Sequence, residues 1–187
     1  LYVQYGRFMV KAVQGDLGRS YSSNRDVLTT IIETFPATAI LAVSALILSS
    51  IIGIMIGVIS SVRPYTFADN FSMLVALFGI SFPPFALGLI MALVFGAWLK
   101  WFPISGYINN GMIYLVLPML TLALRPLAII ARLTRSSMLD VLGQDYVRTA
   151  RAKGVNEWKV IIKHALRNAL NPVITTISAW LAALLGG

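Results

Sequence analysis

The sequence predicts an all-α fold, a polytopic bundle of transmembrane helices. Of its 187 residues, 58% are hydrophobic and only 12% are charged, and the mean hydropathy is +0.80. A soluble domain carries about a quarter charged residues. The apolar residues also form long uninterrupted runs instead of alternating with polar ones. This combination is typical of membrane proteins.

The first membrane span is predicted at 35–62, a stretch without any charged residue. Residues 39–59 include twelve Leu, Ile or Val, which together favour the bilayer by about 5 kcal/mol on an insertion scale. A buried helix of a soluble protein rarely remains apolar on every side over such a length. Within this span, Gly53 and Gly57 form a G-x-x-x-G pair, which suits close packing of helices.

A second charge-free run predicts a span at 70–98, which ends at the boundary residue Trp98. It contains Pro83 and Pro84, and a helix bundle tolerates prolines because neighbouring groups can satisfy the freed carbonyl. These prolines allow two interpretations, a gate hinge and a plain kink in one span. The plain kink is the simpler interpretation.

Two further spans are predicted, at 113–132 and at 172–187. Pro172 is expected to start the last helix, because proline costs little in the first helical turn. The sequence begins with Leu1 rather than Met, and its last apolar run is cut short. We therefore expect a piece of a longer subunit, without the subunit's first and last spans.

The residues before the first span are predicted to form an extracytoplasmic loop, 1–34, with a short interfacial helix. Residues 15–24 are rich in turn-forming types. Asn24 is expected to cap the short helix, because apolar residues recur behind it at spacings of three and four. Residues 35–187 then form the membrane domain.

The long polar loop at 133–171 sets the orientation of the bundle. The positive-inside rule places this loop in the cytoplasm, which puts 97–112 outside, 63–69 inside and 1–33 outside. The net charge of +8 thus reports on membrane topology, and no nucleic-acid partner is expected. The basic residues of the polar segment that begins at the end of the third span are Arg132, Arg135, Arg148, Arg151, Lys153, Lys159, Lys163 and Arg167.

Within this loop, residues 145–172 are predicted to form two short helices joined at Gly154. Glycine suits a left-handed helix end, and Asn156 can cap the second helix. The second helix is predicted to be amphipathic, with an apolar face formed by Trp158, Ile161, Ile162, Ala165, Leu166 and Ala169. The residues alone favour equally a basic helix on anionic lipid headgroups and a docking element for a cytoplasmic protein.

The run RTARAKG at 148–154, followed nine residues later by HALRNAL-x-P, resembles the signature cytoplasmic loop of ABC importer permeases. The longer run RLTRSSMLDVLGQDYVRTARAKG resembles the dipeptide, oligopeptide and nickel branch. Three further stretches resemble the B-type permease subunit of that branch. They are GDLGRSYSSNRDV, the FP before the first span and FPPF in the second span. The resemblance implies a type I, MetI-like permease domain over 35–187. The wider family begins this motif with Glu-Ala-Ala, and those positions are Arg148, Thr149 and Ala150 here. This substitution is common in the dipeptide branch, so it questions the Glu-based contact rather than the family.

The resemblance implies that the loop forms a coupling helix, which inserts into a cleft of an ATPase subunit. The small side chains of Ala150 and Ala152 would allow the coupling helix to approach the ATPase subunit closely. Arg151 and Lys153 would pair with acidic groups of that partner. His164 and Arg167 would brace the loop. The full set implied for ATPase coupling is Asp145, Arg148, Thr149, Ala150, Arg151, Ala152, Lys153, Gly154, His164 and Arg167.

The sequence lacks a G-x-x-x-x-G-K-[ST] phosphate loop. ATP and Mg would therefore be bound by two partner ATP-binding subunits, and this chain is expected to bind no cofactor. The resemblance also implies two further partners, a second permease subunit and an extracytoplasmic solute-binding protein. It implies a multi-pass location in the lipid bilayer of the cytoplasmic (inner) membrane of a prokaryote. The expected solutes are di- or oligopeptides, with nickel chelates, glutathione or oligosaccharides as alternatives. A channel or scaffold without ATP coupling is a remote alternative.

An intramembrane enzyme would need paired carboxylates, a Ser/His arrangement or a metal cluster. The predicted spans offer no such set, and His164 is the only histidine in a chain without Cys. We therefore expect neither catalytic nor metal-binding residues.

Arg125 lies seven residues before Arg132, about 10 Å deeper along a helix. An arginine within the membrane costs about 3 kcal/mol unless it finds water or a partner. Arg125 thus either faces the solute pathway and meets a substrate carboxylate, or extends to the cytoplasmic edge past a kink at Pro126. The second interpretation is the simpler one.

Overall fold

The computed structural model describes residues 1–106 and 111–186. Residues 107–110, part of the predicted outer loop, and Gly187, the end of the predicted fourth span, lie outside the described residues. Every regular element that is described is a helix, so the predicted all-α fold is confirmed. The chain forms two compact units, Leu1–Ile40 and Leu41–Gly187, which are treated separately below.

The first unit contains α1, Tyr2–Val13, a loop and the beginning of α2, Val27–Val62. Asp26 caps α2, because its carboxylate accepts hydrogen bonds from the Thr29 amide at 2.9 Å and the Thr29 hydroxyl at 2.8 Å. The bond from the Thr29 amide lowers the pKa of the Asp26 carboxyl.

Two expectations for this region differ from the structure. The cap is Asp26 and not Asn24, because Asn24 lies two residues earlier, in a left-handed turn with φ of 53°. The expected short helix is not a separate element either. It is the first part of α2, which continues through Pro36 because a single proline removes only one backbone hydrogen bond.

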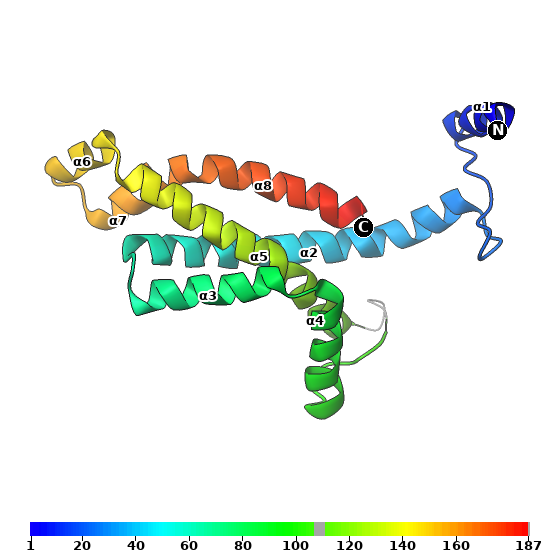
Figure 1. Ribbon diagram of the computed structural model, residues 1–187, viewed down its shortest axis with the longest axis horizontal. Coiled ribbons are helices and arrows are strands. Elements are labelled where there is room, and N and C mark those ends of the chain that lie inside the picture. The colour runs from blue at the N-terminus through cyan, green and yellow to red at the C-terminus, as the bar shows by residue number, and fades with distance from the viewer. Residues whose placement is uncertain (107–110, 187) are drawn as a thin grey trace. The chain divides into compact units, whose positions relative to one another are not determined.

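In the second unit, several long helical segments run in roughly the same direction (Figure 1). They are the rest of α2 together with α3, α5 and α8, with bounds Phe67–Ser81, Ile113–Leu142 and Arg167–Gly186 for the last three. α5 is central and packs against α3, α4 and α8. By length and composition, the stretches of the described chain that can each cross a membrane are Val27–Val62, Ile113–Leu142 and Glu157–Gly186.

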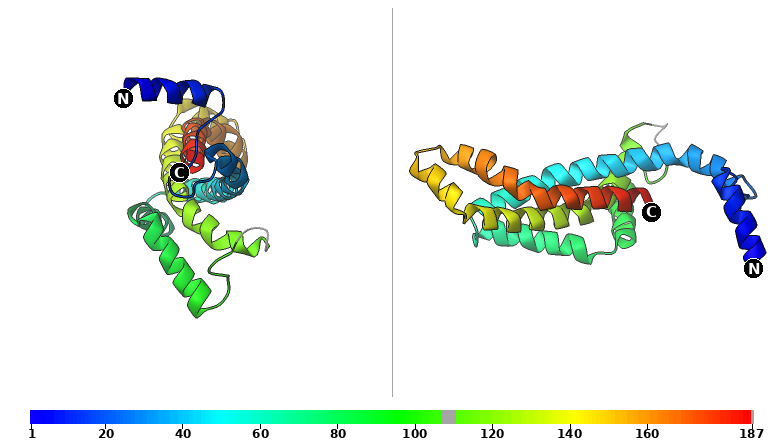
Figure 2. Two further views of the ribbon diagram at one scale, coloured as in Figure 1. Left: turned by 90° about the vertical axis from the view of Figure 1, so that its right-hand side faces the viewer. Right: turned by 90° about the horizontal axis from the view of Figure 1, so that it is seen from above.

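The predicted second span is broken rather than kinked. α3 ends at Ser81, and α4, Pro84–Met91, continues into the π-helical segment η1, Ala92–Trp98, at 103° to α3. Phe82 and Pro83 each precede a proline, which disfavours the helical conformation for both, and their ψ angles of 130° and 132° are extended. The two prolines therefore set a corner, and the plain-kink interpretation is wrong. The second view in Figure 2 shows α4 turned away from the direction of α3.

Two helices are longer than the predicted spans. α5 continues ten residues past Arg132 to Leu142. Pro172 does not start a helix but lies inside α8, which continues from shorter helical segments that begin at Glu157. Ala169 and Val173, before and after this proline, are both buried.

α2 and α5 touch backbone to backbone at the predicted G-x-x-x-G pair. A Cβ atom on Gly53 would lie 2.9 Å from the carbonyl oxygen of Leu127, and one on Gly57 would lie 2.7 Å from that of Ala131. No residue larger than glycine fits such an approach without a shift of the helices. The pair therefore fixes the position of α2 against the central helix.

Candidate functional site

The polar loop folds into a helical hairpin, residues 143–166, at one end of the second unit (Figures 1 and 2). Its first arm is α6, Asp145–Ala152, and its second arm consists of α7, Glu157–Lys159, and the π-helical segment η3, Val160–Leu166. The two arms meet at Gly154, whose φ of 76° is the left-handed conformation that the sequence predicts. The Trp158 amide donates to the Asn156 side chain at 2.9 Å, which confirms the predicted cap.

The hairpin has a small apolar core of its own. Val147, Ala150 and Val160 are buried together, with Val155 packed against them. Ala150 is only 8% exposed, so this side chain serves the packing between the two arms and not, as expected, close approach of a partner. Ala152 is exposed and remains available for such an approach.

A second apolar cluster fixes the hairpin to the bundle. It consists of Met138 on α5 and Ile161, Ala165 and Ala169 on the second arm and α8. Of the predicted apolar face, Ile161, Ala165 and Ala169 are buried in this cluster. Trp158 and Ile162 are more exposed, at 68% and 39%, and line an apolar pocket against α2. The hydrogen bonds of η3 follow the π-helical pattern, which spans five residues instead of four.

One charged pair closes the tip of the hairpin. The Arg151 guanidinium donates to Glu157 across the Gly154 turn, with a shortest N–O distance of 2.7 Å. These hydrogen bonds raise the pKa of the Arg151 side chain. Arg151 is thus engaged within the hairpin, while its pairing with an acidic group on a partner stays a prediction.

The exposed rim of the first arm is polar. Asp145 and Arg148 lie 3.7 Å apart and are both open to solvent, and the Thr149 hydroxyl donates to the Asp145 carbonyl. Lys153 is exposed beside the turn. This rim contains several of the ten residues implied for ATPase coupling. Together with Ala152 and Gly154, it is the surface of the first arm that a partner can contact.

The two arms are braced by residues that the sequence did not single out. Asn168 donates to the Tyr146 hydroxyl at 2.8 Å and to the His164 carbonyl at 3.3 Å. His164 thus contributes through its backbone, and Arg167 is exposed. The expected brace through the side chains of His164 and Arg167 is replaced by the Tyr146–Asn168 contact. Nothing local marks this contact, because its two residues are 22 positions apart.

A buried ion pair lies near the root of the hairpin, and sequence reasoning missed it. Arg135 on α5 donates two hydrogen bonds of 2.6 Å to the Asp69 carboxylate, one to each oxygen. The Tyr65 amide donates a third, at 2.8 Å. Asp69 lies in the first turn of α3, where the helix dipole favours negative charge, and it is only 1% exposed. The only sequence signal is an isolated acid beside a long charge-free run.

Arg125, the remaining candidate, lies on α5 with its side chain exposed. It is followed by the buried Pro126. Among the described residues, no group of three or more Asp, Glu, His or Cys side chains lies close enough to bind a metal ion.

Comparison with known proteins places this arrangement in a family. Residues 50–187, which include the hairpin, match the family described as "Binding-protein-dependent transport system inner membrane component". The chain belongs to this family. The permease resemblance carried by the hairpin motif is therefore confirmed, and the long apolar helices of the chain are those of an inner-membrane component.

Relatives in this permease family match over the whole chain. A protein of Escherichia coli named "Glutathione transport system permease protein GsiC" is 43% identical over 187 residues. Proteins of the same name from Shigella dysenteriae serotype 1 and Shigella boydii serotype 4 are 43% and 42% identical. The match covers 100% of this chain and 60% of each relative, so the chain spans about three fifths of the length of these relatives.

Proposed function

We propose that this chain is the membrane-spanning permease subunit of an ATP-driven importer, a transport subunit rather than an enzyme. The hairpin carries the proposal. Its arms are held together by their own core, and its first arm displays an exposed polar rim at one end of the bundle. Membership of the binding-protein-dependent transport family supports this assignment.

The proposed partners follow from the same assignment. Two ATP-binding subunits supply ATP and Mg, and one of them grips the rim of α6. A second permease subunit completes the pathway, and an extracytoplasmic solute-binding protein delivers the solute. Closure of the ATPase pair moves the hairpin, and α5 carries this movement into the membrane because it is one continuous helix from Ile113 to Leu142.

The proposed solutes are short peptides of the glutathione type. The relatives that support this choice are named as glutathione transport permeases. Glutathione is itself a tripeptide, so it agrees with the peptide class expected from the sequence. Among the described residues, nothing favours nickel chelates or oligosaccharides over peptides.

The docking role can be tested at Gly154. A Cβ atom at this position meets nothing within 4 Å, but φ of 76° strains any β-branched residue by about 1–3 kcal/mol. We expect Gly154→Val in the complete transporter to lower solute uptake at least about tenfold, while the ATPase subunits still hydrolyse ATP. Uptake and ATP hydrolysis are measured together in proteoliposomes.

The matched control is Gly154→Asn, because asparagine tolerates the left-handed conformation far better than valine. This variant is expected to retain most of the coupling between ATP hydrolysis and uptake. Membrane levels of both variants are compared by immunoblot. Normal uptake by a correctly inserted Gly154→Val variant would count against the docking role.

A further inference from the structure

One face of α5 is open along most of its length. Its members follow one another at alternating spacings of four and three residues, which places them in one row on a helix. Each of them is at least partly exposed, whereas Ala123, Ala128 and Ile130 on the other sides of α5 are buried. This open face consists of Pro118, Leu122, Arg125, Ile129, Arg132 and Ser136.

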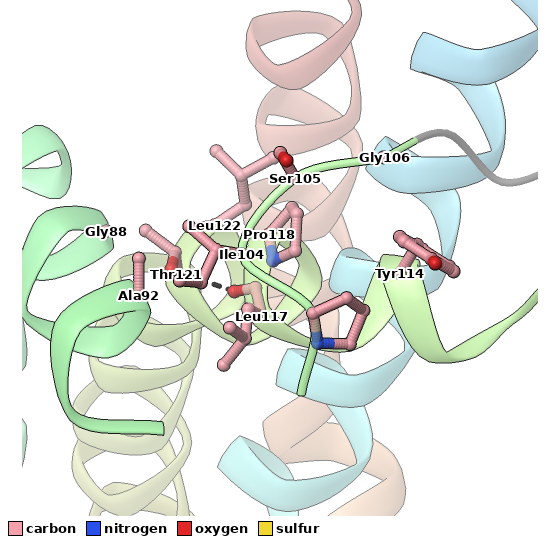
Figure 3. Close-up of a pocket in the computed structure, with 11 residues that line it drawn as sticks. Gly88, Ala92, Ile104, Ser105, Gly106, Tyr114, Leu117, Pro118, Thr121 and Leu122 are labelled. Carbon is pink, nitrogen blue, oxygen red and sulfur yellow. Dashed lines mark hydrogen bonds between the residues drawn. The ribbon is translucent and has the colours of Figure 1, made fainter. Parts of the chain in front are cut away.

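The open face is hollowed at both ends. The first cavity, about 330 Å³, lies between α4, the segment after η1 and α5, and the open face contributes Pro118 and Leu122 to its wall. Figure 3 shows both residues beside Thr121, with Gly88 of α4 and Ala92 of η1 opposite.

The second cavity, about 600 Å³, lies between α3 and α5, towards the hairpin. The open face contributes Ile129, Arg132 and Ser136 to its wall, and α3 contributes Met73 and Ile80. Arg125 lies between the two cavities on the same row. It is one helical turn from Leu122 and one from Ile129, about 5 Å along the axis in each direction.

The open face of α5 carries positive charge. Arg125 and Arg132 are exposed, and α5 has no acidic residue between Ile113 and Ser136. Arg135 lies on a neighbouring side of α5 and is neutralised by Asp69. Arginines on a membrane helix are costly against lipid chains and occur mainly where the helix faces water or a polar partner.

We infer that the open face of α5 lines the solute pathway, and that Arg125, assisted by Arg132, binds a carboxylate of the passing solute. The cavities on both sides of Arg125 support this interpretation over the extension of its side chain to the cytoplasmic edge. A guanidinium binds a carboxylate through two parallel hydrogen bonds, which a lysine cannot reproduce. The inference rests on the proposed function, since it names the site at which that function selects its solute.

The first test is uptake by the complete transporter in proteoliposomes of two forms of one peptide, with a free C-terminal carboxylate and with a C-terminal amide. We expect Arg125→Gln to raise KM for the free acid about tenfold and to leave KM for the amide nearly unchanged. Arg125→Lys is expected to have a smaller effect of the same kind. The control is Arg63→Gln, at an exposed position in the turn between α2 and α3. An equal change for both peptides, or no change, would overturn the carboxylate role.

The second test does not depend on the identity of the solute. The sequence has no cysteine, so Leu122→Cys and Ile129→Cys each place one new thiol on the open face. Both are expected to react with a membrane-impermeant, water-soluble thiol reagent faster than Leu120→Cys, on another side of α5. Equal reactivity of all three thiols would overturn the pathway assignment. If the unchanged transporter takes up neither peptide, the proposed solute class is wrong, and the thiol reactivities still decide whether this face lies in water.

Discussion

Replacement of Asp69 by alanine is expected to destabilise the helix bundle by about 3–5 kcal/mol, because the variant leaves the charge of Arg135 without its partner in a mostly buried position. The two side chains share two hydrogen bonds of 2.6 Å, and the side chain of Asp69 is fully enclosed. The pair joins the start of α3 to α5 close to the hairpin. Its loss should therefore loosen the junction between the bundle and the hairpin.

The measurement is the unfolding midpoint of the purified complex, followed during heating or titration with a denaturing detergent. The matched control is Glu33→Ala, which removes an ion pair of similar length, Arg25–Glu33 at 2.8 Å, whose side chains are more than half exposed. Exposed pairs contribute little to stability, so this control should change the midpoint only slightly. The double variant Asp69→Asn with Arg135→Gln leaves no buried charge and is expected to recover part of the loss. Equal midpoints for Asp69→Ala and Glu33→Ala would contradict the prediction.

Replacement of Gly57 by valine is expected to cost about 1–3 kcal/mol or more, because it overpacks the contact between α2 and α5. A Cβ atom on Gly57 would lie 2.5 Å from the Cβ of Thr134 and 2.7 Å from the carbonyl oxygen of Ala131. Neither atom is the end of a flexible side chain, so the two helices must separate. Gly57→Ala should act in the same direction and more weakly.

The amount of correctly assembled complex in the membrane and its unfolding midpoint measure this effect. The control is Gly6→Ala, because Gly6 also lies inside a helix but a Cβ atom there meets nothing within 4 Å. Alanine has the higher helix propensity, so the control should be neutral or slightly stabilising. A Gly57→Val complex as stable as the unchanged protein would show that α2 and α5 do not pack in the way described.

Local signals in the sequence predicted several local features correctly, although the cap at Asn24 was wrong. The charge-free runs located the apolar helices, and the residue types at Gly154 and Asn156 identified a turn and a helix cap because the conformations involved concern only a few neighbouring residues. The Asp69–Arg135 pair joins residues 66 positions apart. The isolated acid Asp69 stands out beside a charge-free run, but a single sequence does not show which distant residue it pairs with.

Other differences arose where one pattern allows two structures. Pro83 and Pro84 are compatible with a kink or with a corner, and the direction in which the helix resumes depends on what α4 packs against. α5 was expected to end at Arg132 because its charged residues begin there. It continues because Met138 is buried against the second arm of the hairpin. Ala150 was assigned to a partner because small residues suit an interface, but they suit the inside of a tight hairpin equally well.

The extension of α5 past Arg132 has a consequence for access to the hairpin. Ten helical residues raise Leu142 by about 15 Å above Arg132 along the helix axis. The polar headgroup layer on one side of a bilayer is only about 5–8 Å thick. With Arg132 at the depth where the hydrocarbon ends, the first arm of the hairpin, α6, stands clear of the lipid surface, and a large soluble protein can surround it without displacing phospholipid.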